Sequence, residues 1–228
     1  MKREELVTML DLASVKMDTT IADIEEIIDF AIKENIPQIC VNSANVPFAK
    51  KLLEEKHAEN IMLIGTAAFP TGCFPTEIKT AEIQKCAEYG CREIDVCSNQ
   101  GLLKSNLFDD FEADVAACIE AAHKAGMLVK IIVEAASVTP AQMKRSCEIV
   151  AGHGAEFYKT SSGYMENKTL PFHITLIKEV VGDRCQIKAA NGVRTYQQLI
   201  SLYDEGCTRF GVGLPFVRDI LRDCDREG

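Results

Sequence analysis

Residues 121–134, AAHKAGMLVKIIVE, contain the pattern that decides the fold: a helical segment, a glycine and then a run of apolar residues. The same order recurs in EYGCREIDVC (88–97), GHGAEFYKTS (152–161) and YDEGCTRFGVG (203–213). A glycine at this place fits the left-handed residue that closes a helix before the chain turns into a strand. We expect this role for Gly90, Gly126, Gly154 and Gly206. Repetition of helix, glycine and strand is typical of βα units.

The apolar runs are continuous rather than alternating, as expected of parallel strands that are buried on both faces. Eight such runs follow one another, at 12–16, 38–42, 61–69, 92–98, 128–134, 156–161, 185–190 and 208–212. Helical patterns lie between them, one more precedes the first run, and one follows the last. The sequence therefore predicts an α/β fold, a (β/α)₈ TIM barrel with an extra N-terminal helix, and an open doubly wound sheet is the structural alternative. No Pro-, Gly- or Ser-rich linker interrupts the pattern, so we expect a single domain over 1–228.

Composition and charge exclude several classes of protein. The 228 residues include 25 Lys plus Arg against 34 Asp plus Glu, a net charge of −9, so a basic surface for nucleic acid is missing. The sequence contains neither a run of 18 apolar residues nor a signal-peptide pattern. We expect a cytoplasmic protein that binds neither nucleic acid nor membranes. The ten cysteines are scattered, with no C-x-x-C pair, and are expected to be reduced and buried.

Charged side chains inside the expected core strands are the main anomaly. Lys130, Lys159 and Lys188 each lie among apolar or small residues, and Asp95 and Glu134 occupy similar positions. An ammonium in a barrel interior costs several kcal/mol unless it is paired or neutralised. One such lysine is well explained by a structural ion pair. Three on successive strands, with an aspartate on the strand before them, point instead to chemistry.

The two lysines on the sixth and seventh strands are expected to lie side by side. Each ammonium would disfavour the charge of the other, and a Schiff-base lysine needs its pKa lowered from about 10.4 toward neutrality. Asp95 could then act as acid or base, or hold a water for proton transfer. No two of the four histidines are spaced as zinc ligands, so a metal-free iminium mechanism fits better and no cofactor is expected.

Glycine-containing loops follow the last two expected strands. Gly192-Val193-Arg194-Thr195 and Gly211-Val212-Gly213 stand where barrels commonly bind a phosphate. As bare glycine motifs they are weak evidence. Neither a dinucleotide fingerprint, a Walker A motif nor a G-x-S-x-G elbow occurs, which leaves dinucleotide, NTP and serine-hydrolase functions without support.

Several segments, in their order and spacing, resemble the deoxyribose-phosphate aldolase family. They cover about residues 9–213 and are MLDLASV, ICVNSANV, AAFPTGCFPTEIKTAE, EIDVCSN, LVKIIVEAA, AEFYKTSSGY and IKAANGVRT. The pair KTSSG and IKAANGVRT is highly specific. The resemblance implies a class I aldolase, an aldehyde-lyase that joins acetaldehyde and glyceraldehyde 3-phosphate reversibly to give 2-deoxyribose 5-phosphate.

Site residues follow from the resemblance. Lys159 corresponds to the Schiff-base lysine, Lys188 to a second lysine that depresses the pKa of the first, and Asp95 to the proton-transfer acid. The substrate-binding residues implied are Thr160, Ser162, Gly163, Asn191, Gly192, Gly211 and Gly213. The substrate is a small sugar phosphate or aldehyde, and a homodimer is the default assembly.

The departures from the family pattern gather at the phosphate site. Asn191 replaces the first of two glycines, Gly213-Leu214 replaces a pair of serines, and Tyr164 stands where some members have a lysine. Ala13 replaces a threonine common in the first strand. Two alternatives stay open: a lysine-dependent aldolase for an acceptor without phosphate, with Leu214 and Tyr164 shaping a more apolar pocket, or a catalytically idle sugar-binding barrel.

Overall fold

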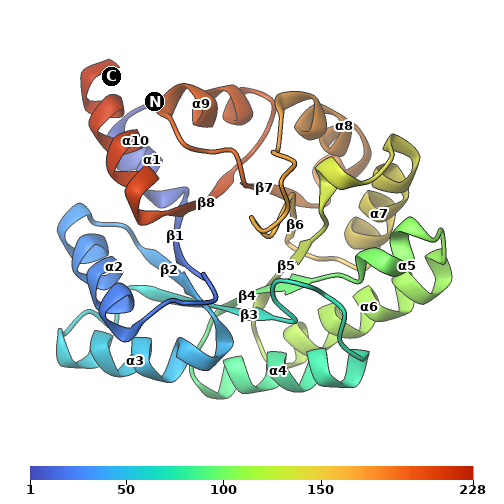
Figure 1. The fold of residues 1–228 in the computed structure, drawn as a ribbon, viewed down its shortest axis with the longest axis horizontal. Coiled ribbons are helices and arrows are strands. Elements are labelled where there is room, and N and C mark those ends of the chain that lie inside the picture. Colours follow the sequence, from blue (N-terminus) through green and yellow to red (C-terminus); the bar gives the residue numbers. More distant parts are fainter. Residues whose placement is uncertain (228) are drawn as a thin grey trace.

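Eight parallel strands close into a barrel, and helices surround it (Figure 1). The computed structural model describes residues 1–227. The strands are β1 (Leu10–Ser14), β2 (Gln38–Val41), β3 (Met62–Ala67), β4 (Glu93–Cys97), β5 (Leu128–Ile132), β6 (Phe157–Lys159), β7 (Gln186–Ala190) and β8 (Arg209–Gly213). Each strand pairs with the next in sequence, and β1 pairs with β8. The TIM barrel is confirmed and the open sheet is excluded.

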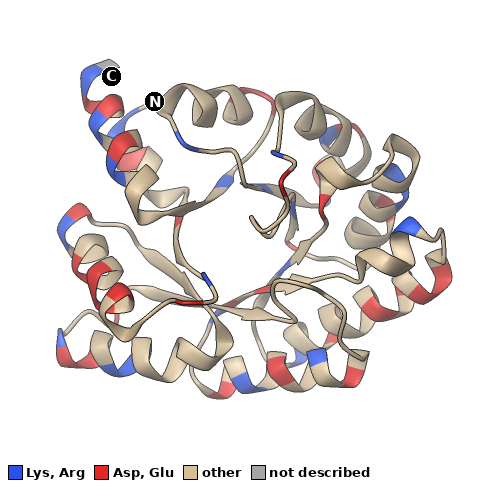
Figure 2. Ribbon diagram, in the orientation of Figure 1, with Lys and Arg blue, Asp and Glu red and all other residues tan. Residues whose placement is uncertain are grey.

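The helices form the outer layer, and charged residues lie both on them and on the strands around the barrel axis (Figure 2). They are α1 (Arg3–Thr8), α2 (Ile21–Glu34), α3 (Val46–Glu55), α4 (Thr76–Glu88), α5 (Gln100–Lys104), α6 (Phe108–Lys124), α7 (Pro140–Gly152), α8 (Pro171–Val181), α9 (Tyr196–Asp204) and α10 (Leu214–Glu227). Helix α1 is the expected extra N-terminal helix, and the short α5 was not expected. No helix between residues 1 and 227 is both long and apolar enough to cross a bilayer.

The helix-closing glycines behave as the sequence predicts. Gly90, Gly126, Gly154 and Gly206 have φ angles of 99°, 73°, 81° and 114°, a conformation that a side chain disfavours. At the other end of α7, the hydroxyl of Thr139 accepts from the amide of Gln142, whose side chain in turn caps Thr139. All ten cysteines are free, and nine of them are buried.

The first strand lies two residues earlier than expected. It covers Leu10–Ser14 rather than 12–16, so Asp11 is inside the barrel and Lys16 is in the loop that follows. The apolar pattern hid this because a charged residue does not normally begin a core strand. Asp11 is tolerated there because Arg209 donates to one of its oxygens at 2.8 Å.

The lower part of the barrel interior is an ion-pair network. Lys130 on β5 is fully buried and lies 2.5 Å from Glu93 and 3.7 Å from Asp11. Arg209 joins the same two carboxylates. Burial by itself would raise the pKa of Asp11, but Lys188, Lys130 and Arg209 prevail and hold it below its usual value. Charges that would be costly alone are thus mutually compensated.

This network predicts how stability depends on pH. The folded-state pKa of Asp11 is lowered, so its stabilisation is complete above the unfolded value of about 3.9 and is lost as the pH falls below it. We expect Asp11→Asn to lower the free energy of unfolding by about 3–5 kcal/mol at pH 7, since buried cations lose a partner. Urea unfolding from pH 7 down to about 3 should show the wild-type advantage shrinking. An advantage that stays constant with pH would contradict this account.

Candidate active site

Lys159 and Lys188 face each other across two neighbouring strands and share one carboxylate oxygen. Lys159 ends β6 and is the register partner of Lys188 on β7. The amino nitrogens of both lie 2.6 Å from Oδ2 of Asp95 on β4. The side-by-side arrangement expected from the sequence is therefore present. Because one carboxylate oxygen accepts from both amino groups, the three side chains form a single hydrogen-bonded cluster.

Asp95 is held in its charged form. Full burial would raise the pKa of this carboxyl, but Lys130, Lys159 and Lys188 together lower it well below its ordinary value. Lys188 has a second carboxylate partner, Asp11, at 2.5 Å. Burial would lower the pKa of Lys188, yet Asp11 and Asp95 outweigh it and raise the pKa. Lys188 is thus a permanent cation.

Lys159 is placed differently from the other buried cations. It has a single carboxylate partner, whereas Lys188 has two and Lys130 has three. Its side chain is 6% exposed, and it lines a cavity. The network as a whole carries four cations and three carboxylates: Lys130, Lys159, Lys188 and Arg209 with Asp11, Glu93 and Asp95. Lys159 is thus the cation of the network with the fewest carboxylate partners.

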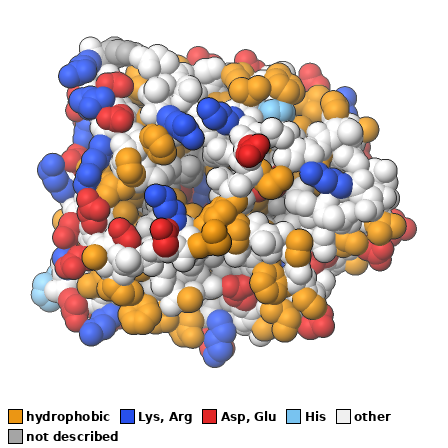
Figure 3. All heavy atoms as spheres, viewed as in Figure 1, with side chains coloured by type: hydrophobic (Ala, Val, Ile, Leu, Met, Phe, Trp, Pro, Cys, Tyr) orange, Lys and Arg blue, Asp and Glu red, His pale blue; other side chains and the backbone are white. Residues whose placement is uncertain are grey.

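The cavity lies at the carboxyl ends of the strands and has a volume of about 230 Å³. In the space-filling view a hollow opens near the barrel axis, with Lys and Arg side chains at its edge (Figure 3). Of the residues expected at the site, those that line the cavity are Lys159, Lys188, Ser162, Gly163, Asn191, Gly192, Gly211 and Gly213. Asp95 lies beneath, fully buried.

Glu134 positions the loop that follows β6. Its two oxygens accept from the hydroxyls of Ser161 and Ser162, and one also accepts from the amide of Ser162 at 2.9 Å. Gly163 then turns with a φ of 91°, which a side chain disfavours. Glu134, which the sequence singled out, therefore anchors the serine-rich loop next to Lys159 by hydrogen bonds.

The side chains of two expected substrate-binding residues are engaged in hydrogen bonds within the protein. Thr160 does not line the cavity; it is fully buried, and its hydroxyl bonds Thr169 and the carbonyl of Ala190. Asn191 lines the cavity, but its amide group donates to the carbonyls of Met165 and Asn167. Both residues hold the 160–170 segment against the barrel.

Two cations at the rim of the cavity were not among the expected site residues. Lys16 and Arg194 both line it, and neither has an ion-pair partner within residues 1–227. The guanidinium of Arg194 lies 5.2 Å from the centre of the Phe216 ring. The signal for Arg194 was its place directly after Gly192-Val193, whereas Lys16 was hidden by the misplaced first strand. Together with the amides at Gly192 and Gly213, they can bind an anion.

Tyr164 also lines the cavity. Its hydroxyl donates to the carbonyl of Val15 at 2.9 Å, and its ring meets Phe69 edge-on with 5.5 Å between centres. Of the two residues expected to shape a more apolar pocket, Tyr164 lines this cavity. Leu214 does not, because it is buried and lines a neighbouring hollow. Leu214 is the first residue of helix α10.

Comparison with known proteins agrees with this geometry. The family model for DeoC/LacD family aldolases matches residues 6–212. Deoxyribose-phosphate aldolase of Thermococcus kodakarensis is 33% identical over 211 residues, which is 92% of this chain and 94% of that protein. Deoxyribose-phosphate aldolase of Finegoldia magna is 34% identical over 207 residues, covering 91% and 95% of the two chains.

Solved structures show the same fold. The aldolase QR15 superposes with a TM-score of 0.86 at 25% identity, covering 96% of this chain and 95% of its own. The tetrameric deoxyribose phosphate aldolase of Aeropyrum pernix superposes with a TM-score of 0.87 at 20% identity, covering 98% and 92%. A family match over most of the barrel, two relatives above 30% identity and the buried lysine pair lead to one conclusion: this chain belongs to the DeoC/LacD aldolase family.

Proposed function

We propose that this enzyme is a class I aldolase that reversibly cleaves 2-deoxyribose 5-phosphate to acetaldehyde and glyceraldehyde 3-phosphate. The observation that carries the proposal is the Lys159 amine, which lines the cavity while its nitrogen touches the carboxylate that also holds Lys188. A Schiff-base lysine needs access to substrate, and this position supplies it.

The reaction begins at the open-chain aldehyde of the sugar. The neutral amine of Lys159 adds to C1, and loss of water leaves an iminium. Removal of the proton from the C3 hydroxyl then breaks the C2–C3 bond, and its electron pair moves into an enamine as glyceraldehyde 3-phosphate leaves. Protonation of the enamine at C2 and addition of water release acetaldehyde and the free lysine.

Asp95 and Lys188 manage the protons and the charge in these steps. Asp95 stays ionised and accepts from both lysines, so it can orient the Lys159 amine and a water that carries protons to and from it. Asp11 and Asp95 raise the pKa of Lys188, so this side chain keeps its positive charge beside Lys159. Lys188 is thus a positioning and electrostatic residue in the proposed reaction, and the carbon atoms bind only to Lys159.

The phosphate of the substrate is assigned to the rim of the cavity. Lys16 and Arg194 supply charge, and the backbone amides at Gly192 and Gly213 supply further donors. These cations offset the lost serine pair and the lysine replaced by Tyr164. We therefore favour a phosphorylated substrate over the alternative of an acceptor without phosphate, although the enzyme's overall charge is negative.

Borohydride reduction in the presence of acetaldehyde should attach an ethyl group to Lys159, because hydride fixes the imine as a stable amine. Peptide mass spectrometry locates the adduct. An unmodified Lys159 with the adduct on another residue would refute the assignment, and the absence of any adduct would support the idle sugar-binding barrel instead.

A second test is the variant Lys188→Leu, which removes the neighbouring charge and leaves Lys159 in place. We expect a folded protein, by circular dichroism, with turnover of 2-deoxyribose 5-phosphate reduced by about 100-fold or more. Near wild-type turnover would show that Lys188 has a structural role only.

Substitution of the rim cations should separate phosphate binding from catalysis. We expect Arg194→Ala and Lys16→Ala each to raise KM for 2-deoxyribose 5-phosphate by about 10- to 100-fold, as for one charge-assisted hydrogen bond. Turnover of 2-deoxyribose, which has no phosphate, should change little. Steady-state kinetics on both sugars gives the comparison, and equal losses on both would argue against an anion site at this rim.

The assembly and the location of the enzyme stay predictions from the sequence. A homodimer is our expectation, and light scattering would measure it. The same holds for the cytoplasm and for the single domain over 1–228. Small-molecule substrates are the only partners that the family and the cavity support.

A further inference from the structure

Lys16, one of the two rim cations, lies between two hollows. It lines the catalytic cavity and also a neighbouring hollow of about 260 Å³ between the β1–α2 connection and the start of α10. Asp18, Asp23 and Glu26 line the second hollow, so carboxylates compete there for the Lys16 ammonium. Lys16 can serve the proposed phosphate only if the chain around it directs this side chain toward the catalytic cavity.

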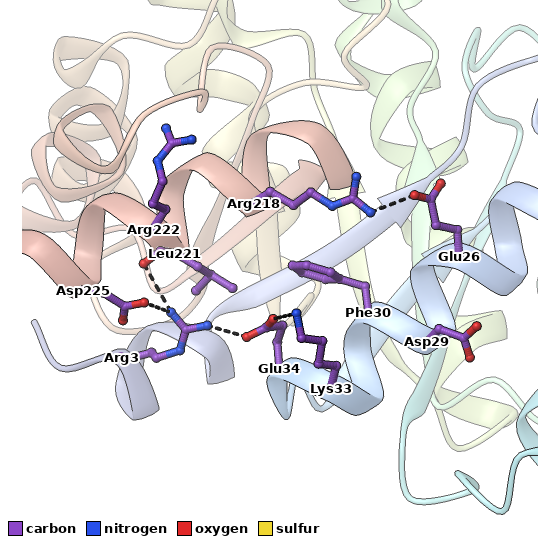
Figure 4. A pocket seen from close by; sticks show the side chains of 10 residues that line it. All are labelled: Arg3, Glu26, Asp29, Phe30, Lys33, Glu34, Arg218, Leu221, Arg222 and Asp225. Atoms are coloured by element: carbon purple, nitrogen blue, oxygen red, sulfur yellow. Dashed lines mark hydrogen bonds and ion pairs between the residues drawn. The ribbon is translucent and has the colours of Figure 1, made fainter.

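The connection that carries Lys16 is fixed at both of its ends. It begins at β1, inside the barrel sheet, and leads into α2. On the outer face of α2, Arg218 of α10 lies 2.7 Å from Glu26, and Arg3 of α1 pairs with Glu34 (Figure 4). Helix α2 is thus tied to its neighbours, so the position of Lys16 depends on contacts made within the connection, residues 15–20.

The Tyr164 hydroxyl bonds the chain on both sides of Lys16. It donates to the carbonyl of Val15 at 2.9 Å. Burial raises the pKa of Tyr164, and a hydrogen bond with the backbone of Met17 acts against that rise. The side-chain amide of Asn42, which follows β2, donates to the carbonyl of Lys16 itself at 3.1 Å. Three successive residues, with Lys16 in the centre, are therefore held by two side chains.

Tyr164 is itself firmly placed, so it can serve as a support. Its amide donates to the hydroxyl of Ser162 at 3.2 Å, and that hydroxyl donates to Glu134. Its ring meets Phe69 edge-on, with 5.5 Å between the ring centres. The backbone of Tyr164 is thus fixed from the end of β5, and its ring is fixed from the loop after β3. A bond from this hydroxyl transmits that order to the β1–α2 connection.

We infer that Tyr164 and Asn42 are positioning residues of the phosphate site: they hold the Lys16 ammonium toward the substrate phosphate and away from the carboxylates of the neighbouring hollow. Both act through Lys16. The inference rests on the proposed cleavage of 2-deoxyribose 5-phosphate and adds the side chains on which its phosphate site depends.

The test is a double-mutant cycle on KM for 2-deoxyribose 5-phosphate. Tyr164→Phe removes the hydroxyl and keeps the ring. We expect it to raise KM by about three- to tenfold, the effect of one neutral hydrogen bond, and to act on KM rather than on kcat. In the Lys16→Ala enzyme the same substitution should raise KM by less than about twofold, because the cation that it positions is absent.

Asn42→Ala provides a second cycle. Asn42 does not line the catalytic cavity, so a change in KM must pass through the connection. We expect the same pattern, a rise in KM with Lys16 present and little further rise beside Lys16→Ala. This cycle decides the question if Tyr164→Phe does not fold, by circular dichroism. The matched control is Tyr203→Phe, the same change on α9 away from both hollows, which should leave KM unaltered.

A rise in KM of equal size with and without Lys16 would overturn this inference, because Tyr164 or Asn42 would then act on the substrate or on the fold. An unchanged KM in Tyr164→Phe or in Asn42→Ala would overturn it as well. Cleavage of 2-deoxyribose 5-phosphate would persist in these cases, so the proposed function would stand. A wild-type enzyme that neither cleaves this sugar phosphate nor forms an adduct on Lys159 would overturn the proposed function instead.

Discussion

The contact of one carboxylate oxygen with two ammonium groups is the constraint on which the rest of the site depends. Oδ2 of Asp95 accepts from Lys159 and Lys188 at 2.6 Å each, and all three residues are buried in the barrel. Such a pair is stable only if neighbouring charges complete the balance. Asp11 does this for Lys188, and Lys130 does it for the second oxygen of Asp95, at 3.1 Å. The interior charges form one unit, and Lys159 is the cation in it with the fewest carboxylate partners.

The barrel geometry explains why the charges meet at all. In a strand, residues two apart face the same side, so Glu93 and Asp95 both point inward while Ile94 packs against the helices. Closure of the sheet then brings β1, β4, β5, β7 and β8 around one axis. Residues far apart in sequence become neighbours, as Asp11 and Arg209 show. The cost of burying each charge is met by partners that only a closed barrel assembles.

The need for partners from distant parts of the chain limits what could be predicted from the sequence. The strands, the helix-closing glycines and the lysine pair follow from local patterns, because each signal lies within a few residues. Asp11 was missed because its partner, Arg209, is 198 residues away. Lys16 was not recognised as a site residue because the first strand was expected at 12–16, which placed this lysine inside the strand rather than in the loop after it. Thr160 was assigned to substrate by resemblance, but its hydroxyl serves the Thr169 bond, and a motif does not record which way a side chain turns.

Catalysis and selectivity are therefore carried by different parts of the molecule. Lys159, the proposed Schiff-base lysine, and its partners are fixed by opposing charges on rigid strands, and a change at any one of them leaves a buried charge unpaired. The rim residues Lys16, Tyr164 and Arg194 lie on loops, and the buried charges of the barrel do not depend on them as partners. Substitutions there alter what fits beside the lysine without disturbing its charge balance. The departures of this chain from its family pattern lie at the rim and at the ends of β1 and β8, where side chains can change at little cost in stability.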